Sequence, residues 1–77
     1  MKYYVIIIKD DSEAIFKYET KNSALSKLHE EMKYALDMDI NTSVCVTDKY
    51  FTQIKKEVYL KPVEVVEEEI AEIEMRK

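Results

Sequence analysis

Residues 2–9 read KYYVIIIK, and this stretch decides the fold. It is rich in aromatic and β-branched residues, which is typical of a β-strand. Successive side chains of a strand point to opposite faces, so the odd-numbered residues from Tyr3 to Ile7 share one face and the even-numbered residues from Tyr4 to Ile8 share the other. Both faces are apolar. We therefore expect a fully buried strand, central in a sheet that is covered on both sides.

The sequence after this strand predicts a hairpin, a helix and two more strands. Acidic and serine residues at 10–13 favour a turn, and Pro62 ends the last strand because proline cannot continue a central ladder. The expected elements are a strand at 14–18, a helix that ends near residue 38, a strand at 42–47 and a strand at 53–60. In the last of these strands, alternation places two groups of side chains on opposite faces, namely Ile54, Val58 and Leu60 on one and Lys55, Glu57 and Tyr59 on the other.

The helix is the clearest element, since its apolar residues recur at helical spacing. Thr20, Asn22 or Ser23 can cap its start. The apolar residues that form one core-facing arc are Leu25, Leu28, Met32, Ala35 and Leu36. His29 lies at the edge of this arc, so we expect it to be partly buried.

A second helix is expected at about residues 63–76. Pro62 suits a first helical turn, and glutamates precede Arg76 and Lys77, the order that the helix dipole favours. Its apolar seam consists of Val63, Val66, Ile70 and Ile73. Like-charged glutamates would meet in a parallel pair of this helix with itself, so we expect the seam to cover the second face of a sheet, in its own chain or a neighbour's, or to form an oligomer interface. The lysines placed to meet its glutamates are Lys55, Lys56 and Lys61.

The sequence thus predicts one α+β domain with a four-stranded antiparallel sheet and the element order ββαββα. Residues 1–61 form a ββαββ core with one amphipathic helix on one face of the sheet. Residues 62–77 form the acidic helix of the same domain. A chain of this size buries only about 60% of its unfolded surface, which makes self-association a common remedy.

Charge is distributed unevenly along the chain. Residues 1–61 carry ten lysines and ten acidic residues, whereas residues 62–77 carry six glutamates against Arg76 and Lys77. The net charge of −4 therefore comes from the last segment. A neutral body with an acidic end argues against direct nucleic-acid binding, which needs a basic surface. The apolar start is too short for a signal peptide or a membrane span, so we expect a cytoplasmic protein without membrane contact.

Few residues could carry catalysis. The chain has no glycine, which excludes glycine-lined phosphate loops. Cys45 and His29 are the only residues of their kinds, so the chain cannot form an internal disulfide or, by itself, a cysteine–histidine zinc site. Cys45 lies in an apolar strand, where poor reactivity is expected. We expect no enzymatic activity, no metal and no cofactor.

The candidate partner-binding residues are acidic and aromatic. Glu64, Glu68 and Glu72 form a row on the expected second helix, and their spacing is comparable with that of phosphates along DNA. Such a row could meet basic residues of a protein or imitate a nucleic acid. Exposed aromatic residues supply interface energy, and the candidates are Tyr34, Tyr50, Phe51 and Tyr59.

Residues 18–35, YETKNSALSKLHEEMKYA, and the cysteine-bearing strand at 43–46 resemble small uncharacterised proteins encoded by phages and prophages of Firmicutes. The resemblance covers residues 2–60 at scattered positions and carries no catalytic residues. It implies an accessory role, such as inhibition of host enzymes or of defence systems, including anti-CRISPR action.

We therefore expect a non-enzymatic protein of this kind that forms a homo-oligomer, with a dimer favoured, and binds a host protein. One alternative is an oligomeric sponge that holds a small nucleotide at a subunit interface, with Lys17, Lys27 or Lys33 beside a tyrosine. Another is a structural oligomerisation module.

Overall fold

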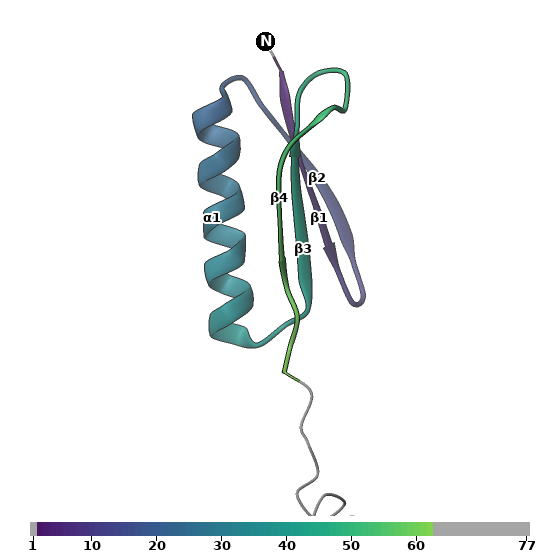
Figure 1. Cartoon of the computed structure of the whole chain (residues 1–77), viewed down its shortest axis with the longest axis vertical. Coiled ribbons are helices and arrows are strands. Elements are labelled where there is room, and N and C mark those ends of the chain that lie inside the picture. The colour runs from purple at the N-terminus through teal and green to yellow at the C-terminus, as the bar shows by residue number, and fades with distance from the viewer. Residues whose placement is uncertain (1, 63–77) are drawn as a thin grey trace, which may run out of the picture.

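The computed structural model describes residues 2–62, which form a four-stranded sheet and one helix (Figure 1). The elements are β1 (Tyr3–Lys9), β2 (Glu13–Tyr18), α1 (Lys21–Met38), β3 (Thr42–Thr47) and β4 (Gln53–Tyr59). The predicted α+β class and ββαββ order are confirmed. The helix expected at 63–76, with its seam, lies outside the described residues.

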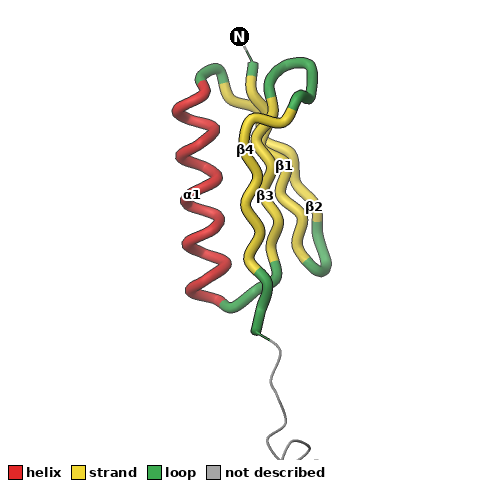
Figure 2. Tube along the Cα trace, in the orientation of Figure 1, coloured by secondary structure: helices red, strands yellow, loops and turns green. Residues whose placement is uncertain are grey.

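The sheet has the order β2-β1-β3-β4, and all neighbouring strands are antiparallel (Figure 2). β1 and β2 form a tight hairpin, and the helix returns the chain so that β3 pairs with the other edge of β1. The apolar strand β1 is therefore central, as its composition predicts, while β2 and β4 are the edges.

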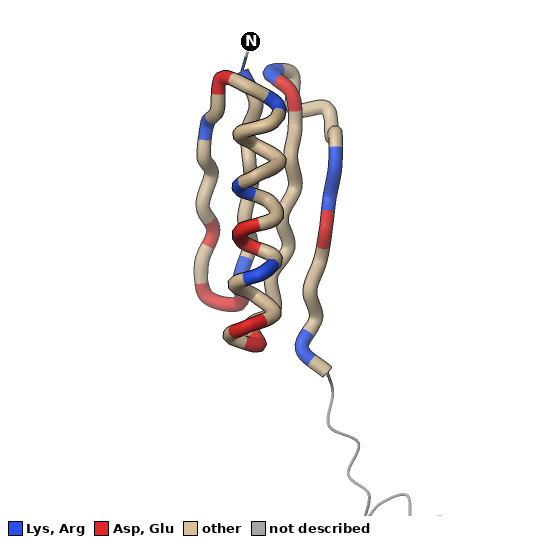
Figure 3. The backbone as a smooth tube through the Cα atoms, turned by 90° about the vertical axis from the view of Figure 1, so that its left-hand side faces the viewer, with Lys and Arg blue, Asp and Glu red and all other residues tan. Residues whose placement is uncertain are grey.

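α1 covers one face of the sheet, and the core lies between them (Figure 3). In Figure 3 the helix crosses in front of the central strands, with β2 on one side and β4 on the other. The buried core residues are Val5 and Ile7 from β1, Val44 and Val46 from β3, and Ala24 and Leu28 from α1. Leu25, Met32 and Ile54 pack at its margin.

The start of α1 is capped as predicted, but the helix is rotated relative to the expected arc. The Thr20 hydroxyl accepts the backbone N–H of Ser23 at 3.1 Å. Ala24, Leu28 and Ala35 are fully buried, whereas Leu36 is 62% exposed and His29 is exposed. The small side chains of the two alanines allow the helix to approach the sheet closely on their side. Since each residue advances by about 100°, His29 and Leu36 are turned away from the sheet, and both expectations of burial are wrong.

The alternation expected in β4 is interrupted by a bulge. The register between β3 and β4 shifts at Val46/Thr47, so Val46 pairs with Lys55 and Thr47 pairs with Gln53. Ile54 is the extra residue, and it packs against the core. Ile54 and Val58 consequently lie on opposite faces, which corrects the expectation that they share one. An extra residue in one strand shifts the alternation of side chains, so every residue on one side of the bulge points to the opposite face of the sheet from the one that simple alternation predicts.

Within residues 2–62 no helix covers the second face of β1, and only the Phe51 ring stacks on it, at Tyr4. Val5 is fully buried and Ile7 is 3% exposed on the helix side, while Ile8 on the other side is 46% exposed. The expectation of a fully buried strand therefore holds for one face only in the described part of the chain.

Candidate functional site

The face of the sheet opposite α1, called the open face below, carries a set of apolar side chains. Cross-strand partners share a face, so the register assigns its residues. Its apolar residues are Tyr4, Ile6 and Ile8 of β1, Ile15 of β2, Cys45 of β3 and Val58 of β4. Several of them are substantially exposed, which is unusual for the face of a sheet in a protein of this size.

The side chains of β3 on the open face are short, and the line that they form is called the trough below. The β3 residues on this face are Ser43, Cys45 and Thr47, which are small and lie between the larger side chains of β1 and β4. In the row that contains Ser43, the neighbours are Ile8 on one side and Val58 on the other. A short side chain between two longer ones leaves a depression.

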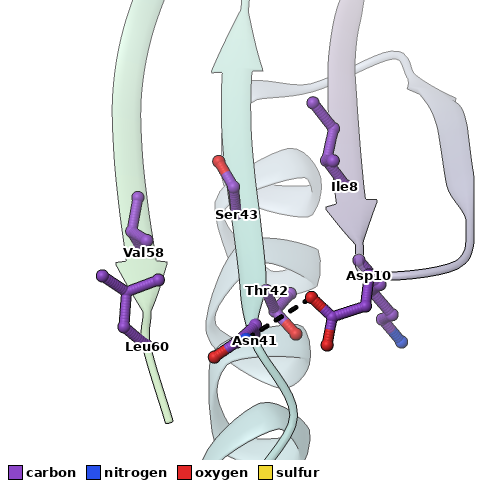
Figure 4. Close-up of a pocket in the computed structure, with 8 residues that line it drawn as sticks. Ile8, Asp10, Asn41, Thr42, Ser43, Val58 and Leu60 are labelled. Carbon is purple, nitrogen blue, oxygen red and sulfur yellow. Dashed lines mark hydrogen bonds between the residues drawn. The ribbon is translucent and has the colours of Figure 1, made fainter. Parts of the chain in front are cut away.

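This depression has a volume of about 190 Å³ and lies at one end of the trough. Figure 4 shows Ser43 between Ile8 and Val58, with Leu60 following β4. The lining also includes Lys9, Asp10, Asn41 and Thr42, while the hydroxyl of Ser43 lies between the aliphatic side chains of Ile8 and Val58. Small-molecule sites usually measure roughly 300–1,000 Å³, so this depression suits one apolar side chain better than a nucleotide.

Asn41 holds the end of this depression together. Its side-chain amide donates to a carboxylate oxygen of Asp10 at 3.4 Å (Figure 4). Its amide oxygen accepts the backbone N–H of Lys61 at 2.6 Å. The turn after β1 and the chain after β4 are thus tied to the start of β3. These bonds keep the walls of the depression at a defined spacing.

The other end of the open face is aromatic. The Phe51 ring stacks on the Tyr4 ring with centroids 4.8 Å apart. Phe51 has φ 62°, a left-handed conformation that is costly for a bulky residue. The loop is held by Asp48, whose carboxylate accepts the backbone N–H groups of Tyr50 and Thr52. The loop therefore fixes Phe51 against the sheet.

The four candidate aromatic anchors do not form one surface. Tyr34 lies on α1 beneath the ammonium group of Lys9, at 5.0 Å. Tyr50 and Phe51 lie in the loop between β3 and β4 and are 75% and 61% exposed. Tyr59 pairs with Thr42 on the helix side of the sheet, near the end of α1. Of the four, only Phe51 contributes to the open face.

Tyr59 and Asp39 form the shortest side-chain hydrogen bond on the helix side. The Tyr59 hydroxyl donates to the Asp39 carboxylate at 2.6 Å. This bond raises the pKa of Tyr59 above its ordinary value of 10.0, because the phenolate would lose the bond and, with some desolvation, lie beside a negative charge. Asp39 also caps the helix in a left-handed conformation.

We expect a pH effect on stability from this pair. The pKa is raised in the folded chain, so the stabilising contribution is fully present below pH 10.0 and is lost as the pH rises through the folded pKa. Urea unfolding at pH 7 and at several values above pH 10 measures this loss. The wild-type chain should lose more stability over that range than Tyr59→Phe, which has no hydroxyl to ionise. Parallel losses in the two chains would contradict the assignment.

Cys45 and His29 lie on opposite sides of the sheet. The Cys45 thiol is on the open face, 3.9 Å from the side-chain oxygen of Gln53, whereas His29 is on α1. The sheet separates them, so they cannot act as a nucleophile–base pair within one chain. Among residues 2–62 no cluster of three or more possible metal ligands occurs.

The lysines considered for a nucleotide site are also apart. Lys17 lies on the open face, paired across the strands with Tyr4. Lys27 lies on α1, 3.3 Å from Glu31 and 4.6 Å from the Phe16 ring centroid. The folded chain does not bring Lys17 and Lys27 together. Of the lysines expected to meet the acidic segment, Lys55 is on the helix side, 3.8 Å from Glu57, and Lys56 is on the open face.

The remaining candidates belong to the C-terminal segment. Glu64, Glu68 and Glu72, and the seam residues Val63, Val66, Ile70 and Ile73, lie outside the described residues. They stay predictions.

Sequence reasoning missed the trough and its walls. The strand TSVCVT alternates small side chains with valines, and this alternation indicates which face of β3 is shallow. Its neighbours become known only from the register.

Comparison with protein-family models, curated proteins and solved structures found no match. Within residues 2–62, no helix combines the length and the apolar character that crossing a membrane requires.

Proposed function

We propose that this chain is a non-enzymatic accessory protein that acts by binding another protein through the open face. The observation that supports this is the exposed apolar wall around the depression, where Ile8, Val58 and Leu60 are 46%, 52% and 71% exposed. Exposed apolar residues that gather on one face mark interaction surfaces more often than scattered ones do.

The chemistry of the open face indicates the kind of segment that it binds. The depression accepts an aliphatic side chain between Ile8 and Val58, above Ser43. Lys56 is the β4 residue in the next row of the trough, opposite Cys45, and it is exposed. An apolar side chain followed at a short distance by a carboxylate would fill the depression and meet this ammonium group. We therefore propose an acidic partner segment with an apolar stripe.

A phage-type role, in which the partner is a host enzyme or a defence protein, rests on the resemblance of residues 18–35. We propose this context for the binding activity. The open face supplies the docking surface, and the resemblance supplies the class of target.

A peptide of residues 62–77 is a suitable probe, because it combines six glutamates with four apolar seam residues. We expect this peptide, added to the ¹⁵N-labelled full chain, to shift the amide signals of Ile8, Cys45 and Val58. A control peptide with serine in place of Val63, Val66, Ile70 and Ile73 keeps the charge and should leave these signals in place.

Two lysine variants give a matched control. Lys56→Glu should weaken peptide binding by about tenfold, which corresponds to about 1.4 kcal/mol. Lys55→Glu makes the same charge change on the helix side and should have little effect. If the peptide shifts helix-side amides instead, or if both variants weaken binding equally, the open face is not the docking surface.

The same titration on a chain that ends at Lys61 tests whether the partner is external. Equal affinities for the two chains would support an external partner. Much tighter binding to the shorter chain would show that the segment of the chain itself occupies the open face, and would overturn the proposal of an external partner as its resident ligand.

A further inference from the structure

β2 has one outer edge that no other strand of residues 2–62 covers. It is the first strand in the order β2-β1-β3-β4. Its central residues Ile15 and Phe16 are 64% and 40% exposed. An exposed edge strand with apolar side chains is a template for pairing with another strand unless charges or bulges prevent it.

The backbone groups available on this edge follow from the hairpin. Lys9 and Ser12 exchange two hydrogen bonds, with the N–H of Lys9 donating at 2.8 Å and the N–H of Ser12 at 3.4 Å. Hydrogen-bonded and non-hydrogen-bonded pairs alternate along an antiparallel ladder. Ala14 and Phe16 therefore bond to β1. The N–H and C=O groups of the intervening residues Glu13, Ile15 and Lys17 point to the outer edge.

A symmetric antiparallel pair of two β2 strands places one residue opposite its own copy. If this residue is Ile15, then Glu13 lies opposite Lys17 of the second copy, and Ala14 lies opposite Phe16 of the second copy. The same contacts recur on the other side of the axis. The outward backbone groups of Glu13, Ile15 and Lys17 then meet outward groups of the second strand.

The side chains in this register complement one another. The Glu13 carboxylate faces the Lys17 ammonium group in two symmetric pairs, and the Phe16 ring faces the Ala14 methyl group in two more. The two Ile15 side chains meet at the centre. Neither Glu13 nor Lys17 forms an ion pair within the described chain. Lys17 instead lies beside Lys2, which lowers the pKa of Lys17 by a side-chain hydrogen bond and by repulsion. A facing carboxylate would relieve this repulsion.

We infer that two copies of this chain pair through the outer edges of their β2 strands, centred on Ile15. The two four-stranded sheets then join into one sheet of eight strands. The two-fold axis that relates the two copies is perpendicular to the joined sheet. The open faces of both copies therefore lie on the same side of this sheet and become continuous. This inference does not depend on the proposed function, since it uses the edge and not the trough.

The other edge opposes such pairing. The middle of β4 reads Lys55, Lys56 and Glu57. A symmetric antiparallel pair centred on any of these three residues places like charges directly opposite one another, which is destabilising. The bulge beside Ile54 also twists this edge away from a straight ladder. The middle of the β4 edge is thus less suited to self-pairing than the middle of the β2 edge.

The neighbouring register on β2 is less favourable. A pair centred on Phe16 places Glu13 opposite Glu19 of the second copy and Ile15 opposite Lys17 of the second copy. Compared with the register centred on Ile15, this register replaces the two attractive Glu13–Lys17 contacts by two repulsive Glu13–Glu19 contacts. Of these two registers, the sequence of β2 favours the one centred on Ile15.

Sedimentation velocity of the full chain over a wide range of concentration tests the inference. An edge of this length is a small interface, so we expect a reversible, concentration-dependent dimer. Ile15→Lys places two ammonium groups on the axis and should give a monomer at every concentration. Lys56→Glu, on the β4 edge, should leave the dimer unchanged. Circular dichroism and urea unfolding of each variant verify that the fold is retained.

Charge reversal provides the decisive comparison. Glu13→Lys and Lys17→Glu each place like charges across the axis, so each variant alone should be monomeric. Mixing the two variants should restore a dimer, because every facing pair in the mixed species has opposite charges. A variant with both substitutions should also dimerise with itself.

Three results would overturn the inference. The first is a wild-type chain that stays monomeric at millimolar concentration. The second is a dimer that persists in Ile15→Lys, which would place the interface elsewhere. The third is a mixture of folded Glu13→Lys and Lys17→Glu chains that stays monomeric.

Discussion

Replacing Leu28 with alanine should lower the free energy of unfolding by about 2–5 kcal/mol, as large-to-small changes in a core do. Leu28 is fully buried and lies between the helix and the sheet, among the core residues. Its removal leaves a cavity that the rigid sheet cannot fill. Small domains have only about 3–5 kcal/mol of stability from a single core, so much of this variant should be unfolded at room temperature. Urea unfolding followed by circular dichroism measures the loss.

Leu36→Ala is the matched control, because it makes the same change in the same helix. Leu36 is 62% exposed, and we expect a change within about 0.5 kcal/mol, as for ordinary surface positions. If the two variants lose equal stability, the rotational setting of α1 described above is wrong.

Val46→Asp should be the most destabilising single change in the sheet. Val46 is fully buried at the centre of the core. A buried carboxylate without a partner is strongly unfavourable, and it is tolerated only when it is protonated. The variant should therefore be unfolded at neutral pH and regain structure as the pH is lowered. Circular dichroism between pH 7 and pH 4 measures this recovery.

Cys45→Asp serves as the control, because Cys45 is adjacent to Val46 in the chain but lies on the other face of the sheet. The new carboxylate would lie opposite Lys56 across the strands, where opposite charges are favourable. We expect this variant to stay folded at neutral pH. If both variants were equally unfolded at neutral pH, the open face would be packed as tightly as the helix side.

Much of the fold follows from local patterns. The two apolar faces of residues 2–9 predict a central strand, and β1 has neighbours on both edges. The helix starts after Thr20 and ends at Met38 as its cap and spacing predict. Caps, turns and periodicity depend on residues a few positions apart, so the sequence alone reveals them.

The rotation of α1 could not be obtained in the same way. Helical spacing of large apolar residues centres the arc between Leu25 and Leu36, but the fully buried residues of α1 include Ala24 and Ala35. Close approach of two layers depends on where side chains are small. A helical pattern based on the large apolar residues therefore misplaces the centre of the buried face of α1.

The candidate site also could not be predicted from the sequence. The shallow face of β3 is visible in its alternating residues, but the depression exists because Ile8 and Val58 lie on either side of Ser43. These three residues come from strands far apart in the chain. The bulge at Ile54, which decides the facing of the first part of β4, has no clear local signal.

The sequence by itself determined the class of the domain, the order of its first five elements and the central place of residues 2–9. These features rest on hydrophobic period and capping, which act within one element. Only the tertiary structure decided that α1 covers a single face. Within residues 2–62 it also leaves apolar side chains exposed on the second face and leaves the outer edge of β2 without a neighbouring strand. These features rest on pairing register and layer contact, which join residues that the chain separates.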